Sequence, residues 1–195
     1  MTSSINLEKK EGYLQVIMGP MYSGKTTGLL RELTIYKELG LDVIYVNHSL
    51  DTRSEQDFST HNPLISTIGK ISSLKTANLR DVFEEINKYD VIGIDEYQFF
   101  DELTVILELV EVYNKKVFLS GLNSDFMRNP FQSIYSVLPY ADKVLHLHSA
   151  CSVCIKNKIY KTAIFSKRIV HSTEKVFVGA SESYIPVCRN CYLNS

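Results

Sequence analysis

A glycine-rich octapeptide constrains the fold of this 195-residue chain more than any other feature of its sequence. Residues 19–26 read Gly-Pro-Met-Tyr-Ser-Gly-Lys-Thr, which matches the pattern G-x-x-x-x-G-K-T. The apolar run Leu14–Met18 precedes it, and Leu29, Leu30 and Leu33 follow it at helical spacing. Glycines let consecutive backbone N–H groups turn toward one anion, and the helix dipole reinforces that binding. The sequence therefore predicts a strand, a phosphate-binding loop and a helix that ends at Gly40.

The side chains of this loop suit a nucleoside triphosphate. The Lys25 ammonium can reach the outer phosphates, and the Thr26 hydroxyl can ligate Mg²⁺. A chance match in a turn is the alternative, but the flanking strand and helix argue against it. The predicted ATP contacts are Gly19, Pro20, Met21, Tyr22, Ser23, Gly24, Lys25 and Thr26.

Apolar runs and helical stretches alternate along residues 13–148. Further strands are predicted at Val43–Val46, Val91–Ile94, Val117–Leu122 and Val144–Leu147, and helices at Asn78–Lys88 and Leu103–Tyr113. The polar segment 49–76 is predicted to be a long loop with a short strand around residues 64–71. Strands that alternate with helices predict an α/β fold, in which helices cover both faces of a parallel sheet.

The strand predicted at Val91–Ile94 ends on two adjacent carboxylates, Asp95 and Glu96. Ligands of open α/β sheets bind at the carboxyl ends of the strands. We therefore expect Asp95 to hold Mg²⁺ through its water shell and Glu96 to act as a general base. The alternatives are a solvent-facing carboxylate at Asp95 and, as in many ATPases, activation of water by Glu96.

All four cysteines lie near the C-terminus, as two C-x-x-C pairs. Each pair can supply two thiolates from one turn, which suits tetrahedral Zn²⁺, and a site filled by four cysteines is structural. The predicted ligands are Cys151, Cys154, Cys188 and Cys191. Disulfides or a redox motif are the alternatives, and Fe could occupy the same four ligands.

Charge and hydropathy limit the partners and the compartment. A formal net charge of −1 gives no general attraction for nucleic acid or anionic membrane. No apolar run is long enough to span a bilayer, and residues 1–12 lack the apolar core of a secretory signal. We expect a cytoplasmic protein with a flexible tail at 1–12, a nucleotide-binding domain at 13–148 and a cysteine-containing domain at 149–195.

Several short motifs, in one order from Gly12 to Tyr192, resemble the type II (cytosolic-type) thymidine kinase family. The phosphate loop is similar to the family's G-P-M-F-S-G-K-S/T, with Tyr22 for the usual Phe. The family's D-T-R, D-E-x-Q-F-F and G-L-D-x-x-F segments are similar to residues 51–53, 95–100 and 121–126, and a later Thr60-His61 also fits. The C-terminal part, with 165–168, 176–179 and Tyr184, resembles the family's lasso and zinc module.

The resemblance implies a P-loop (RecA-like) sheet with a small C-terminal zinc-ribbon and lasso domain. It also implies a thymidine kinase that transfers the γ-phosphate of MgATP to the 5′-hydroxyl of thymidine or deoxyuridine, in pyrimidine deoxynucleotide salvage for DNA synthesis. Glu96 would be the catalytic base, assisted by Lys25 and Arg53. Asp51, Asp95 and Gln98 would join the ATP and magnesium site.

By the same resemblance, one group of residues would bind the nucleoside. Phe126 would pack on the base, while Met21, Leu122, Ser166 and Tyr184 would surround its 5-methyl group. Backbone groups of Lys175, Val176, Phe177, Val178 and Gly179 would bond the pyrimidine edges. The family also implies a homotetramer and feedback inhibition by dTTP.

Some of these assignments have ordinary alternatives. Core packing explains an aromatic residue at 126 or 184 equally well, and Arg53 can be a solvated loop charge. Ser166 stands where the family has Thr, which removes a methyl from the base pocket and relaxes specificity. A zinc-containing ATPase that acts on nucleic acid is the rival function, against which the near-neutral charge argues. An inactive nucleotide-binding protein fits poorly, because every residue that the chemistry needs is present.

Overall fold

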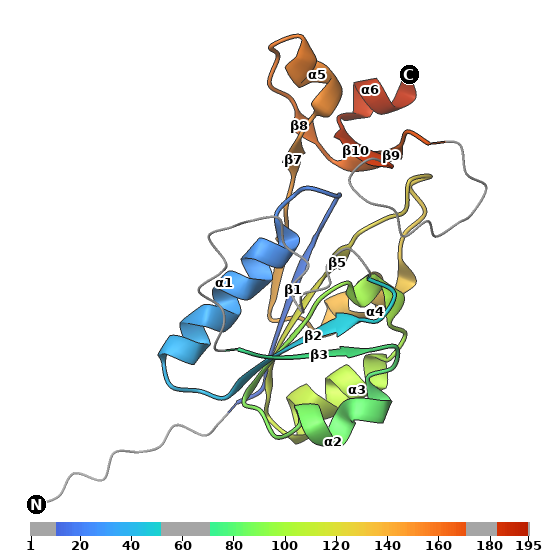
Figure 1. Cartoon of the computed structure of the whole chain (residues 1–195). Coiled ribbons are helices and arrows are strands. Elements are labelled where there is room, and N and C mark those ends of the chain that lie inside the picture. The colour runs from blue at the N-terminus through green and yellow to red at the C-terminus, as the bar shows by residue number, and fades with distance from the viewer. Residues whose placement is uncertain (1–10, 52–70, 171–182, 195) are drawn as a thin grey trace, which may run out of the picture.

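The computed structural model describes residues 11–51, 71–170 and 183–194, and a parallel sheet forms its centre (Figure 1). The six strands are β1 (Tyr13–Gly19), β2 (Val43–His48), β3 (Ser72–Thr76), β4 (Val91–Ile94), β5 (Lys116–Leu122) and β6 (Lys143–His146). They lie in the order β3-β2-β4-β5-β1-β6, and every neighbouring pair is parallel. The predicted parallel α/β sheet is therefore confirmed. Strand β5 separates the strand before the phosphate loop from the strand that ends in carboxylates.

Helices cover both faces of the sheet, as predicted (Figure 1). On one face, α1 (Lys25–Glu38) packs Leu29, Leu30 and Leu33 against the sheet. The other face is covered by α2 (Phe83–Ile86), α3 (Leu103–Leu107) and α4 (Gln132–Val137). Each fully buried leucine contributes about 1.5–3 kcal/mol relative to exposure, so these apolar faces hold the layers together.

Helix α1 ends where the sequence predicts, for a local reason. Gly40 has a left-handed conformation with φ of 84°. Its N–H bonds the carbonyl of Lys37, and the N–H of Leu41 bonds that of Tyr36. This is a Schellman motif, which satisfies the last carbonyls of the helix and turns the chain toward β2.

The structure corrects four details of the predicted elements. Residues 72–76 were assigned to a long loop but form strand β3, because they pair with β2. The helix predicted over residues 103–113 changes at Glu108 to a π-helical segment, Glu108–Val112. Helix α4 was not predicted, and the expected helix at 78–88 consists of a 3₁₀ turn, Arg80–Val82, followed by α2.

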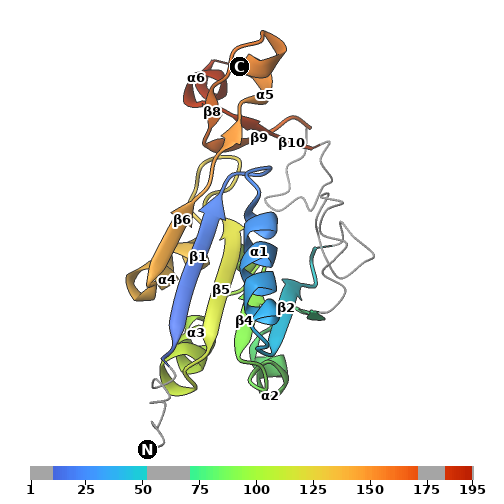
Figure 2. The ribbon, with the colours of Figure 1, turned by 90° about the vertical axis from the view of Figure 1, so that its left-hand side faces the viewer.

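The C-terminal part is a small unit with buried residues of its own. It contains β7 (Ser149–Ala150), α5 (Ser152–Lys156), β8 (Thr162–Ala163), β9 (Phe165–Arg168), β10 (Tyr184–Val187) and α6 (Arg189–Leu193). Strands β7 and β8 form one antiparallel pair, and β9 and β10 form another. Figure 2 shows this unit beyond the carboxyl ends of β1 and β6. Within the described segments, the helices are all too short or too polar to cross a membrane.

Candidate active site

The phosphate loop connects β1 to α1 in the form that anion binding requires. Gly24 precedes α1 with φ of 83°, and Tyr22 also has a left-handed backbone with φ of 61°. The Lys25 ammonium donates a hydrogen bond to the carbonyl of Pro20 at 2.9 Å, so it folds back over the loop. The Ser23 hydroxyl is buried and has no hydrogen-bond partner in the described part of the chain. Unpaired buried donors of this kind fit a loop that takes up a phosphate.

Asp95, at the end of β4, lies beside the first turn of α1. Its Oδ2 accepts a hydrogen bond from the Tyr45 hydroxyl at 3.0 Å, and its Oδ1 accepts one from the N–H of Glu96 at 2.9 Å. Burial is the main cause that raises the pKa of Asp95, and the Glu96 charge adds to it. The Thr26 side chain is close enough to hydrogen-bond Asp95, which lowers the pKa of Asp95. A hydroxyl and a carboxylate side by side are ligands that suit Mg²⁺.

Glu96 has an unusual backbone conformation and a polar neighbour. Its φ of 52° and ψ of 35° are left-handed, and its side chain is buried. Such a conformation is costly for a residue other than glycine and occurs often at functional sites. The Gln98 amide donates from Nε2 to Glu96 Oε2 and accepts, at Oε1, the N–H of Leu122 at 2.9 Å. Gln98 therefore links the carboxylate to the end of β5.

A third carboxylate, Asp51, approaches the same edge of the sheet from the end of β2. It is 2 % exposed, and its Oδ2 accepts a hydrogen bond from Asn47 Nδ2 at 3.0 Å. Burial first, and then the charges of Asp95, Glu96 and Asp51, raise the pKa of Tyr45 well above its ordinary value. The Tyr45 hydroxyl thus bonds one acidic side chain, and the charges of two more act on it. Sequence reasoning placed Tyr45 only within a strand.

The predicted nucleoside contacts come from segments far apart in the sequence. The Ser166 hydroxyl, on β9, accepts a hydrogen bond from the Met21 N–H of the phosphate loop at 2.9 Å. Phe126 and Tyr184 meet through Arg168, a residue that we did not predict. The Arg168 guanidinium stands 3.8 Å above the centre of the Phe126 ring and donates to the Tyr184 hydroxyl at 2.7 and 3.2 Å.

One sequence signal could have identified Arg168. Side chains two residues apart in a strand lie on the same face, so Arg168 shares a face with Ser166. The register of β9 and β10 also pairs Arg168 with Tyr184. Several other predicted contacts lie outside the described residues: Arg53, and Lys175, Val176, Phe177, Val178 and Gly179. The Thr60-His61 motif also lies outside them.

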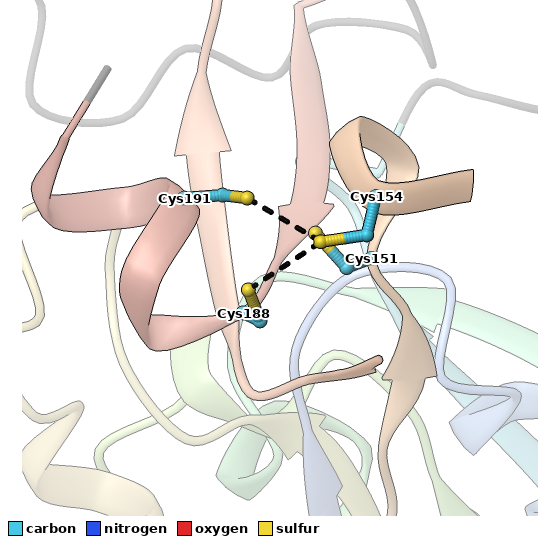
Figure 3. A group of neighbouring side chains, drawn as sticks. All are labelled: Cys151, Cys154, Cys188 and Cys191. Carbon is cyan, nitrogen blue, oxygen red and sulfur yellow. Dashed lines mark hydrogen bonds between the residues drawn. The ribbon is translucent and has the colours of Figure 1, made fainter. Parts of the chain in front are cut away.

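The four cysteines form a cluster with metal-site geometry, and their side chains point toward one another (Figure 3). All four Sγ atoms lie within 4.8 Å of one another. Cys154 Sγ is 3.9 Å from that of Cys188 and 3.5 Å from that of Cys191. A tetrahedron of thiolates about 2.3 Å from a zinc ion has edges of about 3.8 Å, so this spacing fits zinc. The disulfide alternative is wrong, because all four cysteines are free.

The electrostatics of the cluster also suit a cation. Burial acts to raise the pKa of Cys151, but backbone N–H groups of Cys188 and Cys154 outweigh it and lower that pKa to about 6. The hydrogen bond with Cys154, assisted by burial, raises the pKa of Cys191 to about 12. Without a cation, repulsion between neighbouring thiolates prevents all four thiols from ionising together. A bound cation stabilises every thiolate.

Comparison with known proteins gives one consistent family. The family model described as "Thymidine kinase" matches residues 12–192. A thymidine kinase of Choristoneura biennis entomopoxvirus is 40% identical over 185 residues, covering 92% of this chain and 95% of its own. Thymidine kinase 1 of Dictyostelium discoideum is 36% identical and covers 93% and 78%. Thymidine kinase of vaccinia virus (strain Western Reserve) is 34% identical and covers 94% and 98%.

One solved structure supports the fold alone. The flagellar accessory protein FlaH from Methanocaldococcus jannaschii aligns over 73% of both chains with a TM-score of 0.51 and 15% identity.

Proposed function

The chain belongs to the thymidine kinase family, and we propose that it transfers the γ-phosphate of ATP to the 5′-hydroxyl of thymidine. The products would be thymidine monophosphate and ADP. The observation that carries this proposal is the contact between Met21 and Ser166. It joins the phosphate loop to a second unit that bears aromatic side chains, which an enzyme that only hydrolyses ATP does not require.

The phosphate loop and the acidic strand end would bind the triphosphate. The loop amides and the Ser23 hydroxyl would bond the phosphates, and Lys25 would leave the Pro20 carbonyl for an outer phosphate oxygen. Thr26 and Asp95 would hold Mg²⁺, with Asp51 ordering its waters. When bound, the ion neutralises charge on the transferred phosphate group. Arg53 would add a further cation.

Glu96 would accept the proton that the nucleoside hydroxyl loses during transfer. A carboxylate within hydrogen-bond reach of that hydroxyl can act as the base, and such catalysis contributes about 10²–10⁴-fold in rate. The bond from Gln98 supports this role, because it holds one carboxylate oxygen and orients the other. A strained backbone at residue 96 is consistent with a side chain kept in one position for chemistry.

The nucleoside would lie between the phosphate loop and the C-terminal unit. Phe126 would pack on the pyrimidine, with Met21, Leu122, Ser166 and Tyr184 near its 5-methyl group. Backbone groups of residues 175–179 would bond the base edges, as the resemblance implies. Deoxyuridine differs by one methyl, and the short Ser166 side chain favours its acceptance as a second substrate.

The remaining expectations stay predictions. They comprise a structural Zn²⁺ at the four cysteines, a division into a nucleotide-binding domain at 13–148 and a zinc domain at 149–195, a homotetramer, and inhibition by dTTP. The separate buried cluster around the cysteines supports the division. Absence of nucleic-acid binding and a cytoplasmic location also stay predictions.

A nucleoside panel tests the proposed function. Purified protein with MgATP would be assayed for ADP formation with thymidine, deoxyuridine, deoxycytidine and deoxyguanosine, and separately with single-stranded DNA. We expect strong stimulation by thymidine, weaker stimulation by deoxyuridine and none by DNA. If thymidine does not raise ADP formation above the background without nucleoside, the proposal is wrong. Stimulation by DNA alone would favour the rival ATPase function.

A further inference from the structure

The turn that carries Phe126 is braced mainly by its own residues. The Asp125 carboxylate accepts hydrogen bonds from the N–H groups of Met127 and Asn129 at 2.9 and 2.8 Å and from the Asn129 side chain at 2.9 Å. Ser124 and Pro130 form an isolated antiparallel bridge at the base of the turn. These bonds fix the shape of the turn but do not fix its position relative to the C-terminal unit.

One hydrogen bond joins this turn to the helix of the cysteine cluster. The hydroxyl of Tyr192 donates to the backbone carbonyl of Phe126 at 2.8 Å, across 66 positions of sequence. The guanidinium of Arg128, from the same turn, lies 4.7 Å from the centre of the Tyr192 ring and 5.6 Å from that of Phe165. The turn is therefore attached to an aromatic pair on the C-terminal unit.

Tyr192 is itself firmly placed. It lies on α6 directly after Cys191, and its N–H bonds the carbonyl of Cys188 at 2.9 Å. Its ring packs on Phe165 with a centroid distance of 5.2 Å. Cys188, the residue before α6, and Cys191, in its first turn, both belong to the cluster. A change in the cluster would therefore move the helix that carries Tyr192.

From these contacts we infer that Tyr192 is a positioning residue for the nucleoside base. Its hydroxyl sets the position of Phe126 through the backbone carbonyl. In this way it connects the cysteine cluster to the turn that carries Phe126. The inference rests on the proposed function, in which Phe126 packs on the pyrimidine. Tyr192 would not touch the substrate, and the phosphate loop would not depend on it.

Tyr192→Phe tests the inference, because it removes only the hydroxyl and keeps the ring against Phe165. A single neutral hydrogen bond is worth about 0.5–1.5 kcal/mol, so we expect the KM for thymidine to rise about two- to tenfold. The kcat and the KM for ATP should stay within about twofold of wild type. Amide hydrogen exchange of residues 124–130 should become faster, while zinc content stays unchanged. Tyr160→Phe, at a tyrosine that is 78% exposed in the same unit, is the control.

The outcomes separate this inference from the proposed function. An unchanged KM for thymidine together with unchanged exchange at 124–130 would overturn the inference, even if the wild type is an active thymidine kinase. Equal increases in the KM for thymidine and for ATP would also overturn it, because they indicate general destabilisation. If the wild type does not phosphorylate thymidine, the proposed function fails first, and hydrogen exchange alone then decides whether Tyr192 holds the turn.

Discussion

The Ser166 hydroxyl accepts a hydrogen bond from the backbone N–H of Met21 at 2.9 Å, although 145 positions separate the two residues. Ser166 is 5 % exposed, so this bond is largely shielded from water. It connects the loop that suits phosphate with the unit that carries Arg168 and Tyr184. The Ser166 side chain therefore fixes the position of the phosphate loop relative to the C-terminal unit.

Ser166→Ala should weaken that connection, since it leaves the Met21 N–H without its acceptor. An unsatisfied buried donor costs about 1–3 kcal/mol, so we expect a lower unfolding temperature and a reduced kcat/KM for both substrates.

Ser166→Thr retains the hydroxyl and adds the methyl that the family usually has. One methyl is worth about 1 kcal/mol, and we expect up to about fivefold more discrimination for thymidine over deoxyuridine. Unchanged discrimination in Ser166→Thr would show that residue 166 does not approach the base.

Glu96→Gln should remove most turnover but retain ATP binding. The variant cannot accept a proton, so kcat should fall by about 10²–10⁴-fold if Glu96 is the base. ATP affinity, measured by calorimetry with a non-hydrolysable analogue, should remain close to wild type. Glu84→Gln is a matched control, because that carboxylate is exposed on α2. Near-normal turnover of Glu96→Gln would exclude Glu96 as the proton acceptor.

Arg168→Met should act on the nucleoside side of the site alone. It removes the cation above Phe126 and both hydrogen bonds to Tyr184, while a long apolar side chain keeps part of the packing. A cation–π contact is worth about 0.5–2 kcal/mol, and the lost bonds add to it, so we expect the KM for thymidine to rise about tenfold. The KM for ATP should not change. Lys161→Met, at an exposed residue of the same unit, should leave both KM values unaltered.

Metal removal should destabilise the C-terminal unit before the sheet. We expect one zinc ion per chain by mass spectrometry of metal content, and a fall in unfolding temperature after treatment with a strong chelator. For a chain of this size, about 1 kcal/mol corresponds to about 2–4 °C. Cys191→Ser should lose the metal and show the same fall, whereas Ser152→Ala should keep both the metal and the stability. A metal-free wild type that unfolds at the same temperature would contradict a zinc site, and an iron content would correct the identity of the metal.

The sequence by itself determined the parts of this protein that local pattern controls. The phosphate loop follows from two glycines at fixed spacing, and the strands of the sheet follow from short apolar runs. The sequence also predicted that Asp95 and Glu96 end a strand and that the cysteines form two pairs. Each of these features depends on residues close together in the chain.

Only the tertiary structure decided how these parts meet. Strand β3 was not predicted, because its sequence is polar and it becomes a strand only by pairing with β2. Three further residues gain their roles from partners that are distant in the sequence. Arg168 lies over the Phe126 ring, and Tyr192 bonds the Phe126 carbonyl. Tyr45 is affected by the charges of Asp95, Glu96 and Asp51. Hydrophobic periodicity reports which face of an element is buried, but it does not report which polar side chain that face will meet. Packing of the two units brought Arg168 and Tyr192 to Phe126, and packing of β2 against β4 brought Tyr45 to Asp95. Packing is a property of the whole chain.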